Sequence, residues 1–222
     1  MKKLIIYTAL LLTSLNVFAQ KDAEAKKILD GVAAKYRTFN TIKTDFVFNV
    51  DAQASGIRQS QNGVLITQTK ANKFKITLYK PGSNDLQQEI ISNGKTQWTY
   101  LKAEKEVTVN DANTKAESFN PAQLFTLYQK GYKYIFTGTQ KISGKLYQTV
   151  DLTPEDSKAS FFKIRLAVDK TLKQIYSATF FDNTGGRYTY TLRGAVTAMQ
   201  PAESIFNFDA KAYPGVEMVD LR

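Results

Sequence analysis

The chain has 222 residues, of which 43% are hydrophobic and 12% aromatic, and its formal net charge is +10. It contains no histidine and no cysteine, which excludes Ser-His-Asp triads, thiol nucleophiles, disulfides and zinc sites built from these residues. Because the basic residues are scattered, the charge favours anionic partners such as phospholipid headgroups or acidic proteins, or simply a solubilising surface, over nucleic acid.

The first residues have the three parts of a secretory signal peptide. Met1–Lys3 give a positive start, Leu4–Leu15 form an apolar stretch, and Val17-Phe18-Ala19 supplies the small residues that a signal peptidase recognises. An uncleaved membrane anchor is the alternative, but the stretch is shorter than the ~20 residues that a membrane-spanning helix needs. We therefore expect residues 1–19 to be removed and residues 20–222 to form one soluble domain in the periplasm.

Two segments have the pattern of a helix. In Asp22–Arg37 the apolar residues recur at three- and four-residue spacing, which places them on one face. The second segment, Asn120–Lys130, is shorter: Asn120 can cap it, Pro121 suits its first turn and Gly131 follows its end.

The rest of the chain alternates in short runs that are typical of β-strands, such as Phe46-Val47-Phe48 and Phe74-Lys75-Ile76. The pair Asn93-Gly94 indicates a two-residue hairpin. The short connections predict ten or eleven mostly antiparallel strands. A sheet of that size usually curls, so we expect a mainly β fold with one large curved antiparallel sheet, covered by two or three short helices.

Catalysis by paired carboxylates remains possible in a chain without histidine. The candidate pairs are Glu104 with Glu106, Asp151 with Glu155 or Asp156, and Asp182 with Asp169. All of them lie in turn-like or strand-edge contexts, where a solvated surface carboxylate is the ordinary case. We therefore expect no enzyme activity, no metal and no cofactor.

The chain resembles the LolA family of periplasmic outer-membrane lipoprotein carriers. The matching motifs follow the family's order along nearly the whole chain after residue 19. They are the first helix with Ile28-Leu29-Asp30 and Tyr36, Phe46, Gly63 to Phe74, Ile91-Ser92-Asn93-Gly94-Lys95-Thr96-Gln97-Trp98-Thr99-Tyr100, Asn120-Pro121 to Tyr128, Asp151-Leu152-Thr153-Pro154, Asp169, Phe206-Asn207-Phe208, Tyr213-Pro214-Gly215-Val216-Glu217 and Asp220.

This resemblance implies an unclosed β-barrel whose helices enclose a hydrophobic cavity, with Phe74 at its entrance. Many family members have Arg-Pro shortly before that phenylalanine, and the arginine helps to hold the lid shut. This chain has Lys70-Ala71 there, and lysine lacks the fork of arginine, so lid closure is expected to differ. The residues predicted for the cavity and lid are Phe46, Phe48, Phe74, Ile76, Leu78, Trp98, Tyr100, Leu124, Phe125, Tyr128 and Ile164.

The resemblance also implies the partners of a lipoprotein carrier. A monomer would accept acylated lipoproteins from an inner-membrane ABC release complex and deliver them to an outer-membrane acceptor or to the membrane itself. Two alternatives stay open: a periplasmic lipid or lipoprotein sensor of the RseB type, which usually appends a second domain, and a carboxylate-based hydrolase. The length of the chain argues against the sensor, and the lack of a catalytic constellation argues against the hydrolase.

Overall fold

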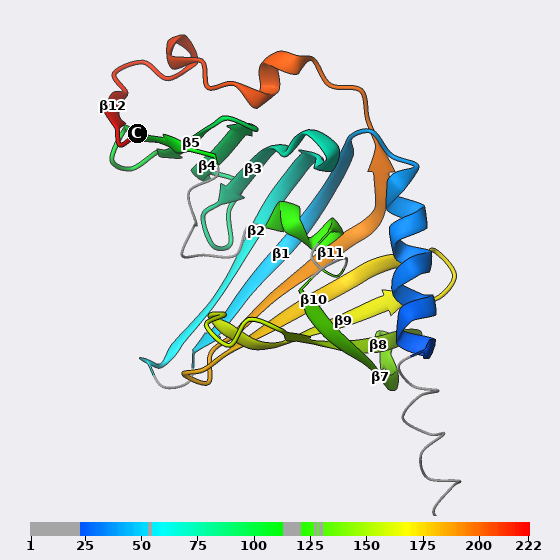
Figure 1. Cartoon of the computed structure of the whole chain (residues 1–222). Coiled ribbons are helices and arrows are strands. Elements are labelled where there is room, and N and C mark those ends of the chain that lie inside the picture. The colour runs from blue at the N-terminus through cyan, green and yellow to red at the C-terminus, as the bar shows by residue number, and fades with distance from the viewer. Residues whose placement is uncertain (1–22, 53–54, 113–120, 127, 129–130) are drawn as a thin grey trace, which may run out of the picture.

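The computed structural model describes residues 23–52, 55–112, 121–126, 128 and 131–222, and it has the expected mainly β fold. One open, curved sheet of twelve strands packs against a helix at residues 23–37, which stands at the right-hand side of the sheet in Figure 1. The strands are β1 (Ile42–Ala52), β2 (Ile57–Gln68), β3 (Lys73–Tyr79), β4 (Leu86–Asn93), β5 (Thr96–Leu101), β6 (Glu106–Asp111), β7 (Tyr132–Ile142), β8 (Lys145–Pro154), β9 (Phe161–Asp169), β10 (Gln174–Asp182), β11 (Arg187–Ala198) and β12 (Glu217–Asp220).

The order of strands in the sheet is β12-β6-β5-β4-β3-β2-β1-β11-β10-β9-β8-β7, so β7 and β12 form its two edges. All described pairs are antiparallel except β12 with β6, because the chain returns over the sheet before it adds this last strand. The sheet is not closed into a barrel. The fold class predicted from the sequence is confirmed, with one or two more strands than expected.

The helices differ more from the prediction than the strands do. The first helix is confirmed over residues 23–37. The second is a 3-10 helix, η3, which spans only Pro121–Phe125, and the predicted cap Asn120 and end Lys130 lie outside the described residues. Three more 3-10 helices are η2 (Thr69–Ala71), η5 (Glu203–Phe206) and η6 (Ala210–Ala212). In the part of the chain that is described, no helix has the length and apolar character to cross a membrane.

The two faces of the sheet are covered to different extents. Cross-strand partners share a face, so the register assigns each side chain to one of them. The inner face carries Phe46, whose partners are Gly63 and Leu192, and it packs against the first helix and η3 in one continuous apolar cluster. The outer face of β3–β5 is crossed by residues 199–216, here called the C-terminal strap, which lies above β3, β4 and β5 in Figure 1.

Candidate functional site

The inner face of the sheet is a continuous apolar surface that includes most of the predicted cavity residues. Seven of them are buried there, and Phe48 and Leu78 are partly buried against the same cluster. Alternation along paired strands produces this surface, since Phe74, Ile76 and Leu78 of β3 face the same way as their partners in β2 and β4. The seven buried residues are Phe46, Phe74, Ile76, Leu124, Phe125, Tyr128 and Ile164.

Aromatic rings form the centre of this surface. Phe46 lies directly over Gly63, where a Cβ atom would collide with the ring. Tyr190 connects its neighbours: it stacks on Phe48 at 4.5 Å between ring centroids and meets Phe180 edge-on at 6.1 Å. Desolvation raises the pKa of Tyr190 far above its ordinary value. The tyrosine therefore stays neutral, and the surface offers ring faces and aliphatic groups to a ligand.

The first helix forms a fixed wall of the site. Its apolar face is buried, and its Tyr36 hydroxyl accepts a hydrogen bond from the backbone N–H of Ile175 at 2.8 Å. Burial raises the pKa of Tyr36 well above its usual range, so this hydroxyl also remains neutral. Because an unpartnered buried N–H is unfavourable, the bond fixes the helix to β10 by a polar contact as well as by packing.

Residues 121–126 and 128, here called the η3 segment, cover this surface by apolar contact. Leu124, Phe125 and Tyr128 are 0%, 1% and 5% exposed, and Phe125 meets the Tyr36 ring edge-on at 4.7 Å. The Tyr128 hydroxyl donates to the Phe125 carbonyl at 3.1 Å, within the segment itself. The side chains of this segment therefore hold it to the sheet by packing.

Phe74 lies inside this packed surface and not at an exposed entrance. It is only 3% exposed, and its β2 partner is Thr67 at the end of that strand. Phe74 is thus close to the rim, since β3 begins at Lys73, but the residue is part of the core in this closed state.

Trp98 and Tyr100 are placed differently from the prediction. Their partners in β4 are Ile91 and Glu89. These two residues pair with Lys75 and Thr77 of β3. Lys75 and Thr77 alternate with the inward-facing Phe74 and Ile76, so the whole row lies on the outer face. Tyr100 is buried on the outer face against Tyr213 at 4.5 Å and Phe208 at 6.2 Å. Trp98 and Tyr100 share one face of β5, as the alternation predicts, but that face is the outer one. The prediction that they line the inner site is therefore wrong.

The C-terminal strap gives the outer face its own apolar cluster, which the sequence analysis missed. Buried residues of β4–β6 and Phe206 of η5 form it, separate from the inner cluster: Ile91, Tyr100, Val107, Val109 and Phe206. The available signal was Ile90-Ile91, two consecutive apolar residues in one strand. Such a run is typical of a strand that is buried on both faces.

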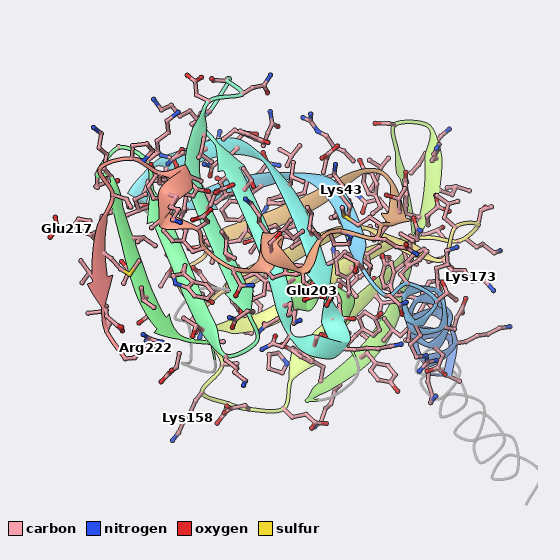
Figure 2. All side chains as sticks on the ribbon, turned by 90° about the horizontal axis from the view of Figure 1, so that it is seen from above. Lys43, Lys158, Lys173, Glu203, Glu217 and Arg222 are labelled. Atoms are coloured by element: carbon pink, nitrogen blue, oxygen red, sulfur yellow. The ribbon has the colours of Figure 1, made fainter. Side chains whose placement is uncertain are left out.

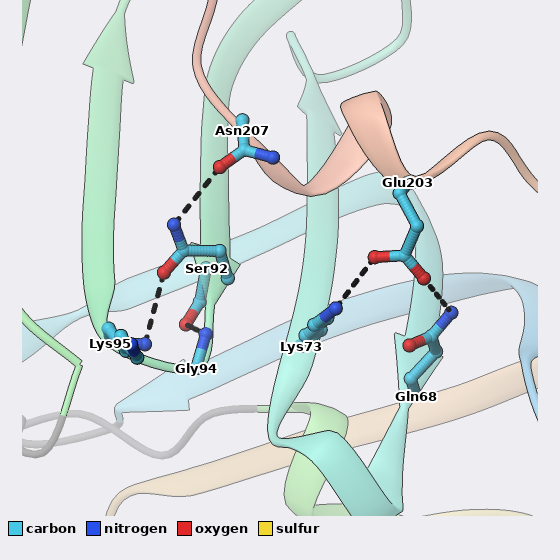
Figure 3. A network of polar contacts seen from close by, with 8 residues as sticks. Gln68, Lys73, Ser92, Gly94, Lys95, Glu203 and Asn207 are labelled. Atoms are coloured by element: carbon cyan, nitrogen blue, oxygen red, sulfur yellow. Dashed lines mark hydrogen bonds and ion pairs between the residues drawn. The ribbon is translucent and has the colours of Figure 1, made fainter.

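Polar contacts tie the strap to the rim of the sheet near η2 and η3. Glu203 accepts from Lys73 Nζ at 2.6 Å and from Gln68 Nε2 at 3.3 Å, and so bridges the two strands that η2 connects (Figure 3). Asn93 Nδ2 donates to Asn207 Oδ1 at 3.0 Å. The strap is thereby bonded to both the β2–β3 and the β4–β5 connections at this rim.

A buried carboxylate makes a further connection under the strap. Glu89 accepts from Thr77 Oγ1 at 3.2 Å, pairs with Lys75 Nζ at 2.9 Å and accepts from the Tyr213 hydroxyl. Desolvation and this hydrogen bond raise the pKa of Tyr213. The paired, hydrogen-bonded carboxylate therefore has a structural role in holding the strap.

Lys70, the residue predicted to take part in lid closure, is exposed in η2. Among the described residues it makes no hydrogen bond or ion pair. The turn itself packs closely on the Asn93-Gly94 hairpin, since a Cβ at Gly94 would collide with the Ala71 carbonyl oxygen. Gly94 has a φ of 88°, as the predicted hairpin requires.

The candidate catalytic carboxylates do not converge. Asp169 and Asp182 lie at opposite ends of β10, where each accepts hydrogen bonds from backbone N–H groups of its own turn. Asp151 accepts hydrogen bonds from Nε and Nη2 of Arg165, at 2.7 and 2.8 Å. Asp169 and Asp182 therefore stabilise their own turns, and Asp151 connects β8 to β9.

Comparison with known proteins agrees with this architecture. Residues 37–209 match the family described as outer membrane lipoprotein carrier protein LolA. An outer-membrane lipoprotein carrier protein of Glaesserella parasuis serovar 5 (strain SH0165) is 27% identical over 210 residues, which are 94% of this chain and 91% of that protein.

Solved structures with a similar fold include an uncharacterized conserved protein from Thermus thermophilus. It has a TM-score of 0.57 and 12% identity, and the match covers 89% of this chain and 99% of that one. A putative outer membrane lipoprotein-sorting protein domain from Vibrio parahaemolyticus has a TM-score of 0.48 and 12% identity, over 83% of this chain and 97% of that one. At this identity the Thermus structure supports the fold alone.

Proposed function

Because this chain belongs to the LolA family of outer membrane lipoprotein carrier proteins, we propose that it carries the acyl chains of lipoproteins across the periplasm. The chains bind between the inner face of the sheet and the η3 segment. Cargo comes from an ABC release complex in the inner membrane and passes to an outer-membrane acceptor or to the membrane itself. The carrier acts as a monomer after removal of residues 1–19, and it needs no catalytic group and no cofactor.

One observation supports this proposal above the others: the inner apolar surface is closed by a short segment that packs on it through Leu124, Phe125 and Tyr128. An acyl chain that enters takes the place of these side chains and restores the same kind of contact. The first helix cannot be exchanged so easily, since Tyr36 is bonded to the backbone of β10. The site thus has a fixed wall and a displaceable cover.

The energetics of such an exchange suit a carrier that must release its cargo. Burial of a methylene group contributes about 0.8 kcal/mol. Several fully buried acyl chains would therefore contribute a binding free energy beyond about 20 kcal/mol, the practical limit of non-covalent affinity. Displacement of the buried η3 side chains opposes binding and lowers the net affinity. The bound state is therefore stable enough for transfer and weak enough for delivery.

We assign nine of the predicted residues to the acyl-binding surface and its cover, without Trp98 and Tyr100. The assigned residues are Phe46, Phe48, Phe74, Ile76, Leu78, Leu124, Phe125, Tyr128 and Ile164. Lys70 is exposed in the turn beside this surface, and its ammonium group is available to the η3 backbone when the cover moves.

A binding experiment with matched lipopeptides tests the proposal. Purified protein is titrated with a fluorescent fatty acyl probe, and the probe is then displaced by a triacylated lipopeptide or by the same peptide without acyl chains. We expect displacement by the acylated peptide only. Native mass spectrometry of protein from its own periplasm should show bound acylated cargo. Absence of probe binding together with cargo-free periplasmic protein would contradict a carrier.

A further inference from the structure

Two neighbouring hairpin tips gather positive charge at one end of the sheet. The β7–β8 tip carries Lys141 and Lys145, and the β9–β10 tip carries Lys170 and Lys173. The tips are adjacent because β8 pairs with β9 up to the partners Tyr147 and Asp169. Within residues 141–146 and 169–174, which are all described, Asp169 is the single carboxylate.

Asp169 does not neutralise these lysines through an ion pair. Its Oδ1 accepts hydrogen bonds from the backbone N–H groups of Thr171 and Leu172, both at 2.9 Å, and so closes its own turn. Four lysines and one engaged carboxylate leave the paired tips strongly positive. Lys173 projects beside the first helix, on the opposite side of the molecule from Lys158 (Figure 2).

Exposed leucines accompany the lysines. Leu146 is 65% exposed and Leu172 is 46% exposed, and each belongs to one of the two tips. The β7–β8 turn is rigid, because Ser143 and Gly144 both have positive φ, at 47° and 83°, as in a two-residue type I′ hairpin. Leucine and lysine are thus presented together on a preformed edge.

A pocket of about 240 Å³ lies next to the two tips. Lys145 and Leu172 line it, and so do Tyr147 and Tyr176, whose stacked rings lie 4.3 Å apart. The surface therefore combines cations, aliphatic side chains and aromatic rings with polar hydroxyls. This combination suits the boundary between headgroups and acyl chains, where lysine stays in water and the apolar groups do not.

We propose that the paired β7–β8 and β9–β10 tips dock this protein on a membrane surface rich in anionic phospholipid. Each lysine near such a surface contributes about fivefold in affinity, and the leucines add burial in the interfacial layer. An acidic protein is the less suitable partner, because both leucines are exposed at the ends of the tips, among the lysines. The inference rests on the proposed carrier function for its biological meaning, since a carrier must reach a membrane, but its test uses protein without cargo.

The experiment measures binding of the cargo-free protein to vesicles by sedimentation. Vesicles of phosphatidylethanolamine with about 30% phosphatidylglycerol are compared with vesicles of phosphatidylcholine alone. We expect binding to the anionic vesicles only, and a decrease when the salt concentration rises from about 50 to 500 mM, because salt screens these contacts. Lys145→Glu should weaken binding about tenfold or more, and Leu146→Ser about fivefold.

Matched controls come from the opposite end of the sheet. Lys158→Glu makes the same charge change and Phe162→Ser removes an apolar side chain that is 51% exposed, so both should leave binding within about twofold of the parent. Equal losses in the controls would overturn the proposal, because the overall charge and exposed apolar area of the protein, and not the two tips, would then explain the binding. No binding of the parent to anionic vesicles would overturn it as well. The acyl-probe titration is independent, so failure of docking and failure of the carrier function are distinguishable.

Discussion

The contact between Gly63 and Phe46 shows how a single residue shapes the inner surface. A Cβ at position 63 would collide with the Phe46 ring, and both residues lie in paired strands that cannot separate easily. We expect Gly63→Ala to lower the free energy of unfolding by about 1–3 kcal/mol, the usual effect of overpacking. The double variant Gly63→Ala with Phe46→Leu should recover part of this loss. Denaturant unfolding of the parent and the variants measures these free energies. If the loss in the double variant equals the sum of the two single losses, the contact between the two residues is contradicted.

Residue patterns predicted which side chains share a face, but not which face is the inner one. Phe46, Phe48, Phe74 and Ile76 were placed correctly because their strands lie at the centre of the sheet, where the alternation is regular. Trp98 and Tyr100 alternate equally well, yet they point outward. A shift of one residue in register moves a whole strand to the other face, and periodicity carries no information about this shift.

The η3 segment provides a prediction at the scale of an element. If it is a displaceable cover, then Phe125→Ala weakens the closed state and should raise the affinity for an acyl probe several-fold, while it also lowers stability. Leu166→Ala is the matched control, because Leu166 is 0% exposed in the sheet itself. This control should lower stability without any gain in affinity. Probe titration and denaturant unfolding of both variants decide the question. Equal changes in both would make η3 an ordinary part of the core.

The strap contact of Glu203 predicts a pH dependence of stability. Hydrogen bonds from Lys73 and Gln68 hold the pKa of Glu203 below its ordinary value of 4.5. A carboxylate with a lowered folded-state pKa stabilises the fold above its unfolded value and loses this effect as the pH falls through the folded value. Glu203→Gln should therefore flatten the acid side of the stability curve.

Denaturant midpoints between about pH 3 and 7 measure this effect. High salt should reduce it, because Glu203 is 65% exposed. Glu104→Gln is the control, since Glu104 is an exposed turn carboxylate without a hydrogen bond or ion pair among the described residues. If both variants show the same curve, the bridge to Lys73 does not contribute.

Elements with strong local signals were predictable from the sequence, and those made by distant contacts were not. The first helix follows from its apolar period, and the β4–β5 hairpin follows from Asn93-Gly94. The strap has no such signal, because η5 and η6 are short turns whose positions depend on Lys73, Asn93 and Glu89 far away in the chain. At residues 121–125 the expected helix is of the 3-10 type, and its predicted ends, Asn120 and Lys130, lie outside the described residues.

The two halves of the sheet are buried differently. Strands β3 and β4 have the inner cluster on one face and the strap on the other, whereas the described residues include no segment that covers the outer face of β7–β11. The half that carries the basic tips is thus stabilised by the inner core alone, and the half beside η2 depends on both layers. We therefore expect the two halves of this continuous sheet to differ in local stability against unfolding.

Hydrogen exchange on two matched variants tests this division. Phe206 and Phe180 are both 0% exposed, but Phe206 lies in η5 against β3 and β4, while Phe180 belongs to the inner cluster. Loss of a buried phenylalanine side chain usually costs about 3–5 kcal/mol. We expect Phe206→Ala to lower amide protection in β3–β6 and to leave β8–β10 close to the parent, because the inner core remains intact. Phe180→Ala should lower protection in both halves, since the inner cluster connects them. Uniform loss in both variants would show that the strap and the inner core unfold as one unit, and then the C-terminal strap could not act as a separate layer.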